Sequence, residues 1–199
     1  MAQGLFIALE GIDGSGTTTH TKLLANWLRR KGLTVVQTHE PTEHRIGRLI
    51  RRLLQDPSVP PAIDALLFAA DRIDNTVNRI HPALKKGKIV ITDRYVESSI
   101  AYQSSSGLEL EWIQKLNRFA LTPSLTILLD ITPYRALKRK KRPKPKEKFE
   151  QTDFLKKVRQ IFLKRANDLG FKVVNAEKTI QEVQTIIRQH VEVLLTSLK

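Results

Sequence analysis

The feature that most constrains the fold is a series of five short apolar runs separated by longer amphipathic stretches. The runs cover residues 5–10, 34–38, 88–93, 125–130 and 171–175, and the last is the least apolar. Nearly continuous apolar runs of this length are typical of parallel strands that are buried on both faces. The sequence therefore predicts a five-stranded sheet core.

The stretches between these runs have the apolar period of helices. Helices are predicted around residues 20–28, 46–54, 61–81, 113–120, 154–162 and 180–194, with the third ending before Pro82 and Phe119 on the apolar face of the fourth. Regular strand–helix alternation implies right-handed crossovers and helices on both faces of a parallel sheet. We see no repeat or linker, and 199 residues suit one domain, so we expect a single α/β domain over residues 1–199.

Positive charge is concentrated in two places. Residues 138–148 read KRKKRPKPKEK, and four arginines at positions 45, 48, 51 and 52 form a second group, within a formal net charge of +14. The first run has prolines and no apolar residue, which predicts a mobile loop or a frayed helix end. Such a loop could be a solvated surface, close over phosphates or sit on nucleic acid. Composition leaves these alternatives open.

Cysteine is absent, which excludes disulfides, thiolate metal sites and a cysteine nucleophile. The start of the chain lacks a basic region, and Glu10 interrupts its apolar run, so it does not read as a signal peptide. No apolar run is long enough to span a bilayer. We expect a cytoplasmic protein with an anionic partner and no membrane association.

A glycine-rich loop follows the first predicted strand and opens the first predicted helix. Its spacing matches the phosphate-binding pattern G-x-x-x-x-G-K-[ST], in which backbone N–H groups and a helix N-terminus surround an anion. The predicted ATP-binding residues are Gly11, Gly14, Ser15, Gly16, Thr17 and Thr18. Thr17 stands where the lysine is expected, so a glycine turn that merely caps a helix is the competing interpretation. The position between strand and helix favours phosphate binding.

Two residues at the end of the third predicted strand add to this site. Asp93 could orient Mg²⁺, directly or through water, together with the Thr18 hydroxyl. Arg94 could form a forked contact with a second phosphate. Considered alone, a structural Asp–Arg pair would be the preferred interpretation of these two residues.

Four segments, FIALEGIDGSG, LLFAADR, ITDRYVESSIAYQ and KFEQTDFLKKVRQIFLKRA, together resemble the thymidylate kinase family. The resemblance implies the P-loop nucleoside monophosphate kinase fold, with five parallel strands, helices on both faces and a basic lid at about residues 138–150. It implies transfer of the γ-phosphoryl group of ATP to dTMP, with Mg²⁺ as cofactor and ADP and dTDP as products. It also implies a homodimer.

The same resemblance assigns roles to residues of this sequence. At the base and sugar it implies that Phe68 stacks on thymine, Arg72 hydrogen-bonds the base, Ser99 reaches the base edge, Gln103 lies nearby and Tyr102 sits under the deoxyribose. At the reacting groups it implies that Arg94 and, more weakly, Arg51 bind the dTMP phosphate, that Asp13 lies near the 3′-hydroxyl and the metal, and that Arg139 and Arg142 are lid arginines. Asp13, Arg94, Arg139 and Arg142 are thus the predicted catalytic residues.

The loop departs from the family because Thr17 replaces its lysine, and residues 13–16 also lack the arginine that some members of the family carry there. The lid is then the obvious source of charge for the transferring phosphate, where one cation can change the rate by about 10³–10⁵-fold. Two alternatives remain: a weakly active or inactive nucleotide-binding homologue, and a basic nucleic-acid-binding protein. The basic run has no interleaved aromatic residue for base stacking, which makes nucleic acid the weaker alternative.

Overall fold

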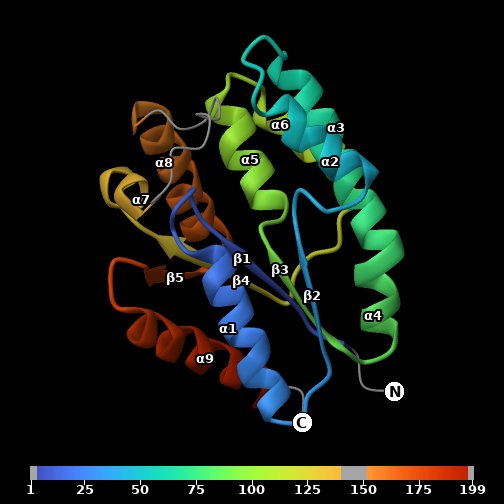
Figure 1. Ribbon diagram of the computed structural model, residues 1–199, viewed down its shortest axis with the longest axis vertical. Coiled ribbons are helices and arrows are strands. Elements are labelled where there is room, and N and C mark those ends of the chain that lie inside the picture. Colours follow the sequence, from blue (N-terminus) through green and yellow to red (C-terminus); the bar gives the residue numbers. More distant parts are fainter. Residues whose placement is uncertain (1–3, 140–151, 197–199) are drawn as a thin grey trace.

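A computed structural model describes residues 4–139 and 152–196. The five strands are β1 (Phe6–Glu10), β2 (Val35–His39), β3 (Ile89–Asp93), β4 (Leu125–Asp130) and β5 (Lys172–Asn175). They form one parallel sheet in the order β2-β3-β1-β4-β5 (Figure 1). The predicted five-stranded parallel sheet is confirmed. Arg142 and nearly all of the predicted lid lie outside the described residues.

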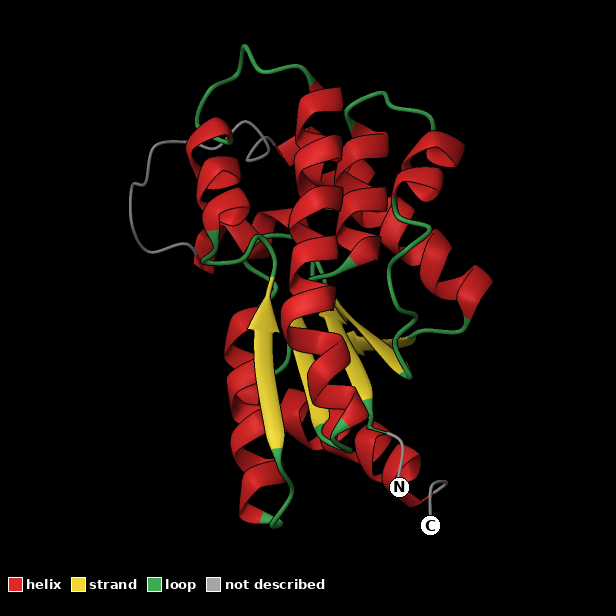
Figure 2. Ribbon diagram, turned by 90° about the vertical axis from the view of Figure 1, so that its right-hand side faces the viewer, coloured by secondary structure: helices red, strands yellow, loops and turns green. Residues whose placement is uncertain are grey.

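The helices surround this sheet. They are α1 (Thr17–Arg30), α2 (Arg45–Leu53), α3 (Pro61–Asn75), the π-helix η1 (Thr76–Ile80), α4 (His81–Lys85), α5 (Val96–Ser105), α6 (Leu110–Leu116), α7 (Pro133–Arg139), α8 (Thr152–Leu169) and α9 (Ile180–Thr196). Figure 2 shows helices extending beyond the strand ends at the upper part of the molecule. None of the helices within the described ranges is long and apolar enough to cross a membrane.

Alternate residues of the central strand β1 face two separate parts of the core. Ile7 and Leu9 belong to the larger cluster, which includes buried residues of α1, α8 and α9. Phe6 and Ala8 belong to a smaller cluster with the end of η1 and α4. Every residue of β1 and β3 is buried. This two-sided burial explains why their sequences are continuously apolar rather than alternating.

Two predictions about helices are wrong. The helix expected to stop before Pro82 continues to Lys85, because η1 changes the backbone path and Pro82 falls in the first turn of α4, where its missing N–H costs no internal hydrogen bond. The helix predicted over 113–120 ends at Leu116, and Phe119 is 65% exposed rather than packed in the core. Arg118 covers its ring instead, with the guanidinium 4.6 Å from the centroid.

Candidate active site

The loop between β1 and α1 has the geometry of an anion-binding turn. Gly14 has a φ of 85°, and a Cβ there would lie 2.4 Å from the Ala136 carbonyl oxygen, so only glycine fits between the loop and α7. The helix α1 begins at Thr17 and has no acidic residue in its first turn. Its positive N-terminal end is therefore available to an anion.

Asp93 and Thr18 meet beside this loop. The Thr18 hydroxyl donates a hydrogen bond to Oδ2 of Asp93, and the other carboxylate oxygen, Oδ1, is buried without a hydrogen-bond partner among the described residues. Buried carboxylate oxygens normally have a partner, so Oδ1 is an unused acceptor at this site. Hard oxygen ligands of this kind fit Mg²⁺, which usually takes one or two protein ligands and completes its shell with water and phosphate. The described residues contain no cluster of three or more acidic or histidine side chains, in keeping with such a sparse site.

Neither Thr17 nor its neighbour His20 supplies the positive charge that the loop lysine would provide. Thr17 is buried, and His20, one turn on, is buried next to Gly16. The Gln184 amide nitrogen lies 2.9 Å from Nδ1 of His20 and donates to the His20 carbonyl at 3.1 Å, so Nδ1 acts as the acceptor. Burial, with the nearby Arg139 charge, lowers the pKa of His20 to about 4. The imidazole is therefore neutral at pH 7 and cannot supply the missing charge.

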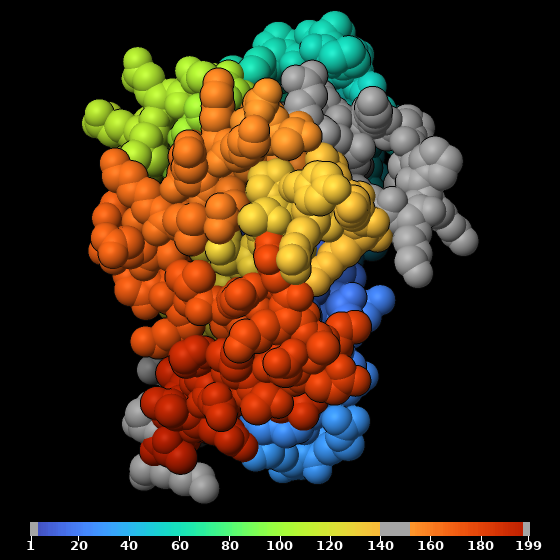
Figure 3. Space-filling model, turned by 90° about the vertical axis from the view of Figure 1, so that its left-hand side faces the viewer, coloured from blue at the N-terminus to red at the C-terminus, as the bar shows by residue number. Residues whose placement is uncertain are grey.

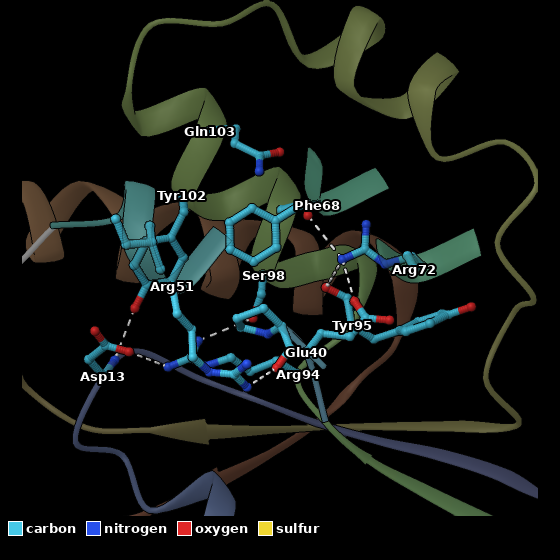
Figure 4. Close-up of a pocket in the computed structure, with 13 residues that line it drawn as sticks. Asp13, Glu40, Arg51, Phe68, Arg72, Arg94, Tyr95, Ser98, Tyr102 and Gln103 are labelled. Carbon is cyan, nitrogen blue, oxygen red and sulfur yellow. Dashed lines mark hydrogen bonds and ion pairs between the residues drawn. The ribbon is translucent and has the colours of Figure 1, made fainter. Parts of the chain in front are cut away.

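A cavity of about 250 Å³ opens beside the loop (Figure 4). Its wall combines apolar and aromatic side chains with several charged groups. The lining residues are Asp13, Glu40, Pro41, Arg51, Leu54, Phe68, Arg72, Arg94, Tyr95, Ser98, Ser99, Tyr102 and Gln103. All eight residues predicted to bind dTMP line this cavity.

Arg72 organises one end of the cavity. Its guanidinium is 1% exposed, forms an ion pair with Glu40 at 2.6 Å and donates to the Tyr95 carbonyl and the Ser99 hydroxyl, both at 3.0 Å. Burial raises the pKa of Glu40 above its usual range, and the Arg72 charge opposes this rise. The Phe68 ring stands beside this group in Figure 4. Arg72 is thus fixed by protein contacts, and the predicted Ser99 hydroxyl is engaged with Arg72.

Gln103 provides an acceptor at the same end of the cavity. Its side chain is buried, and its Oε1 has no hydrogen-bond partner among the described residues. A buried amide oxygen in a cavity wall is a specific receptor for a ligand N–H group.

Arg94 dominates the other end of the cavity, next to the phosphate loop. It has a left-handed backbone, with a φ of 68°, and its guanidinium pairs with Asp13 and donates to the Gly11 carbonyl at 2.8 Å. Tyr102 accepts a hydrogen bond from the Asp13 backbone N–H at 3.0 Å, and the Arg94 guanidinium lies 5.5 Å from its ring centroid. Arg51 donates to the Thr42 and Pro41 carbonyls and pairs with Glu43 at 3.1 Å. Two guanidinium groups therefore reach this end of the cavity.

Comparisons with known proteins agree with this arrangement of loop and cavity. Residues 9–187 match the family described as thymidylate kinase. The chain belongs to the thymidylate kinase family. It is 44% identical to the probable thymidylate kinase of Pyrobaculum calidifontis, over 98% of this chain and 100% of that protein. It is also 44% identical to the probable thymidylate kinase of Thermococcus onnurineus, over 94% of this chain and 97% of that protein.

In this member of the thymidylate kinase family, a residue for which no role was predicted, Glu10, contacts two residues that line the cavity, Tyr95 and Ser98. The carboxylate is 1% exposed and accepts hydrogen bonds from the Tyr95 N–H at 2.9 Å, the Ser98 N–H at 3.3 Å and the Ser98 hydroxyl at 2.5 Å. The Ser98 hydroxyl in turn accepts from Arg94 at 3.2 Å, and the Tyr95 carbonyl accepts from Arg72. Glu10 therefore supports the arginines at both ends of the cavity. Its place as a charged residue at the end of an apolar strand was the available signal.

Burial raises the pKa of Glu10 to about 7, with smaller opposing contributions from the Ser98 hydrogen bond and Arg94. Every contact made by the carboxylate is with a donor, so the network requires the ionised form. A buried carboxylate that holds two residues of the cavity wall thus changes its charge near neutral pH.

The predicted lid arginine Arg139 ends α7, close to the phosphate loop. Its guanidinium donates to the Ala176 carbonyl at 2.8 Å, and it has no ion pair with a carboxylate among the described residues. The neighbouring Arg159 instead has both of its contacts on Asp130, at 2.7 and 2.8 Å. Within the described residues, Arg139 is thus a cation near the loop that is held by a neutral carbonyl group.

Proposed function

We propose that this chain catalyses ATP-dependent phosphorylation of dTMP to dTDP, with ADP as the second product. The observation that carries the proposal is the single cavity that joins Phe68 and Arg72 to Arg94 beside the phosphate loop. A nucleoside monophosphate has the matching shape, with a flat base at one end and a phosphate at the other. The family membership and the full-length similarity to probable thymidylate kinases favour thymine as that base.

In this proposal the thymine lies against the Phe68 ring. The buried Oε1 of Gln103 accepts from the base N–H, and Arg72, held by Glu40 and Ser99, faces the base edge. Tyr102 packs beneath the deoxyribose. Stacking on an aromatic ring contributes about 1–3 kcal/mol per base, so Phe68 should contribute substantially to the affinity for the base.

The dTMP phosphate is proposed to bind Arg94, with Arg51 as a second ligand. The guanidinium fork matches two phosphate oxygens. Asp13, proposed to lie near the sugar 3′-hydroxyl, holds Arg94 in place by an ion pair. The loop residues Gly11, Gly14, Ser15, Gly16, Thr17 and Thr18 hold the ATP phosphates. Thr18 and Asp93 would hold Mg²⁺, which when bound neutralises charge on the phosphoryl oxygens. The residues then only have to align acceptor and donor, since phosphoryl transfer depends mainly on positioning and charge neutralisation.

The phosphate loop is proposed to function without its lysine. Thr17 is buried and His20 is neutral, so the cation for the transferring group has to come from outside α1. Arg139 and Arg142 are the proposed source, in a lid at about residues 138–150 that belongs to a single kinase domain over residues 1–199. In support, α7 contacts the loop at Gly14 and ends at Arg139.

A homodimer in the cytoplasm is the proposed form of the enzyme. The exposed apolar residues Ile63, Leu66, Ile73 and Val77 follow one another along α3 and η1 at spacings of three, seven and four, which places them on one face. Such a stripe suits a self-complementary helix contact. Light scattering of wild type and Leu66→Glu tests this, and equal monomeric masses would refute the dimer.

The decisive experiment measures ADP release with ATP and each nucleoside monophosphate in turn. We expect dTMP to be the preferred acceptor, with dUMP weaker because it lacks the 5-methyl group. Turnover of a ribonucleotide or a purine monophosphate in preference to dTMP would overturn the proposal.

A further inference from the structure

The helix α2 carries four arginines, of which only Arg51 has a role in the proposed site. Arg45, Arg48 and Arg52 are spaced three and four residues apart, so they lie on one exposed face of the helix. Together with Arg51, their side chains line a hollow of about 510 Å³, called here the α2 hollow. A concave surface lined by four guanidinium groups can recognise an oxyanion, and no aromatic side chain lines it to hold a base.

The charge of this hollow is largely uncompensated. The helix α2 contains no acidic residue, and Glu43, just before it in the chain, is paired with Arg51 at 3.1 Å and lies 3.2 Å from Nε2 of His39. Arg45 and Arg52 have no ion pair among the described residues, and Arg48 donates to the neutral Glu43 carbonyl at 3.1 Å. Like charges at these helical spacings repel one another. A bound anion would relieve that repulsion.

The backbone under the hollow is firmly fixed. A Cβ at Gly47 would lie 1.9 Å from the Thr42 carbonyl oxygen, so α2 packs directly on the preceding turn, and Ile50 is buried behind it. Thr42 is tied in turn to the buried Asp71, which accepts from the Thr42 N–H at 2.7 Å and from its hydroxyl at 2.6 Å. The arginines therefore project from a firmly packed backbone.

Arg51 connects the hollow to the acceptor cavity, because it lines both. We propose that Arg45, Arg48 and Arg52 form an accessory anion site that captures the phosphate dianion of the acceptor nucleotide and passes it to Arg51 and Arg94. This inference rests on the proposed function. A nucleic-acid backbone is the less suitable occupant, since no aromatic side chain lines the hollow to stack a base.

The test compares two triple variants with the same change in charge. Arg45→Gln/Arg48→Gln/Arg52→Gln removes the site, while Arg30→Gln/Lys85→Gln/Lys86→Gln removes three exposed charges at the opposite, amino end of the strands (Figure 1). At an ionic strength of about 0.01 M, where the Debye length is about 30 Å, we expect the α2 variant to lose about 10-fold in kcat/KM for dTMP with kcat unchanged. At about 1 M the difference should vanish, because charges are screened beyond about 3 Å.

Calorimetry with two ligands separates this role from a structural one. The α2 variant should bind dTMP more weakly at low salt and bind uncharged thymidine as the wild type does. Equal losses for both ligands, or the same kcat/KM in both triple variants, would overturn the inference. Loss of affinity for single-stranded DNA with unchanged dTMP kinetics would assign the hollow to nucleic acid instead. A wild type that binds dTMP with this salt dependence but does not phosphorylate it would refute the proposed function alone.

Discussion

The base end of the acceptor cavity and the neighbouring phosphate loop are built in different ways. At the base end, Arg72 is buried and held by Glu40, Ser99 and the Tyr95 carbonyl, so its position is set by the protein. Beside the phosphate loop, Asp93 keeps an unused buried oxygen, and the contact of Arg139 within the described residues is with the neutral Ala176 carbonyl.

This difference indicates how the work of the enzyme is divided. A preorganised base end can select the nucleotide without rearrangement, which favours affinity and specificity. An incompletely paired catalytic end acquires its full set of contacts only with substrates and metal, which favours interactions made in the transition state. Variants at the two ends should therefore affect different kinetic constants.

The largest effect is expected for the lid arginines. Arg139→Gln/Arg142→Gln should lower kcat by about 10³-fold while the Kd for ATP changes much less, because the charge acts on the transferring phosphoryl group. Single-turnover rates and ATP binding measure the two effects separately. A variant that keeps its kcat would remove the main contrast between the two ends.

A second step sharpens the same test. Thr17→Lys should partly rescue the lid variant, because both cations would act on one developing charge and their effects would not add. An equal gain in wild type and lid variant would show that the lid never substituted for the loop lysine.

Next in size is Arg94→Lys, expected to lower kcat by about 10²-fold. Lysine keeps the charge but cannot make the forked contact with phosphate, and it is no more strained than arginine in the left-handed backbone. Its thermal unfolding curve should match the wild type. Turnover near the wild-type rate would reduce Arg94 to a structural partner of Asp13.

Phe68→Ala should act on the base end and raise the KM for dTMP by about 10-fold or more, since a base stack is worth about 1–3 kcal/mol. The constant kcat should change less, in contrast to the two preceding variants. Phe68→Leu, which retains apolar contact without the aromatic face, serves as the matched comparison. Unchanged kinetics in both variants would place the base elsewhere.

The smallest effect is expected for Glu10→Gln, which supports both ends indirectly. The wild-type kcat/KM should rise with pH through about 7 as Glu10 ionises, and the variant should lose this limb with a roughly 3- to 10-fold lower plateau. The dTMP phosphate titrates identically in both proteins, so the difference between the two profiles isolates Glu10. Superimposable profiles would mean that the carboxylate does not act through Arg94 and Arg72.

Deprotonation of Glu10 should lower the free energy of unfolding, although it raises kcat/KM. The folded-state pKa of Glu10, about 7, lies above the ordinary value of 4.5, so the native protein binds the extra proton between these pH values. The Glu10 contribution therefore makes the fold less stable as pH rises through this window. Thermal melts of wild type and Glu10→Gln across that range measure it, and the variant should show the shallower decline.

The sequence was sufficient for the sheet and for residues whose role depends on the end of a strand. Asp93 and Arg94 follow a buried strand, and parallel strands bring their carboxyl ends together, so their closeness to the loop was predictable. Glu10 also ends a strand, but its partners were not predictable, because they are groups of Tyr95 and Ser98, which lie 85 and 88 residues further along the chain.

The helix boundaries that were missed have local causes that periodicity does not encode. Pro82 is tolerated because the π-helical turn before it resets the hydrogen-bond pattern. Phe119 is exposed because α6 ends at Leu116, and the favourable contact with Arg118 replaces burial. In both places the backbone path was decided by neighbouring geometry rather than by the apolar pattern.

The contact between Gly14 and Ala136 bears on how such an enzyme could change through evolution. The position is restricted twice, by its left-handed backbone and by a carbonyl oxygen that leaves no room for a methyl group. A substitution there would have to be accompanied by movement of α7, whereas a side chain at Thr17 can be exchanged with the backbone left as it is. This loop can therefore tolerate substitutions that change its charge, but not substitutions that change its backbone shape. A lineage that lost its loop cation could recover from it by gaining another elsewhere, while a lineage that lost Gly14 would have to rebuild two elements at once.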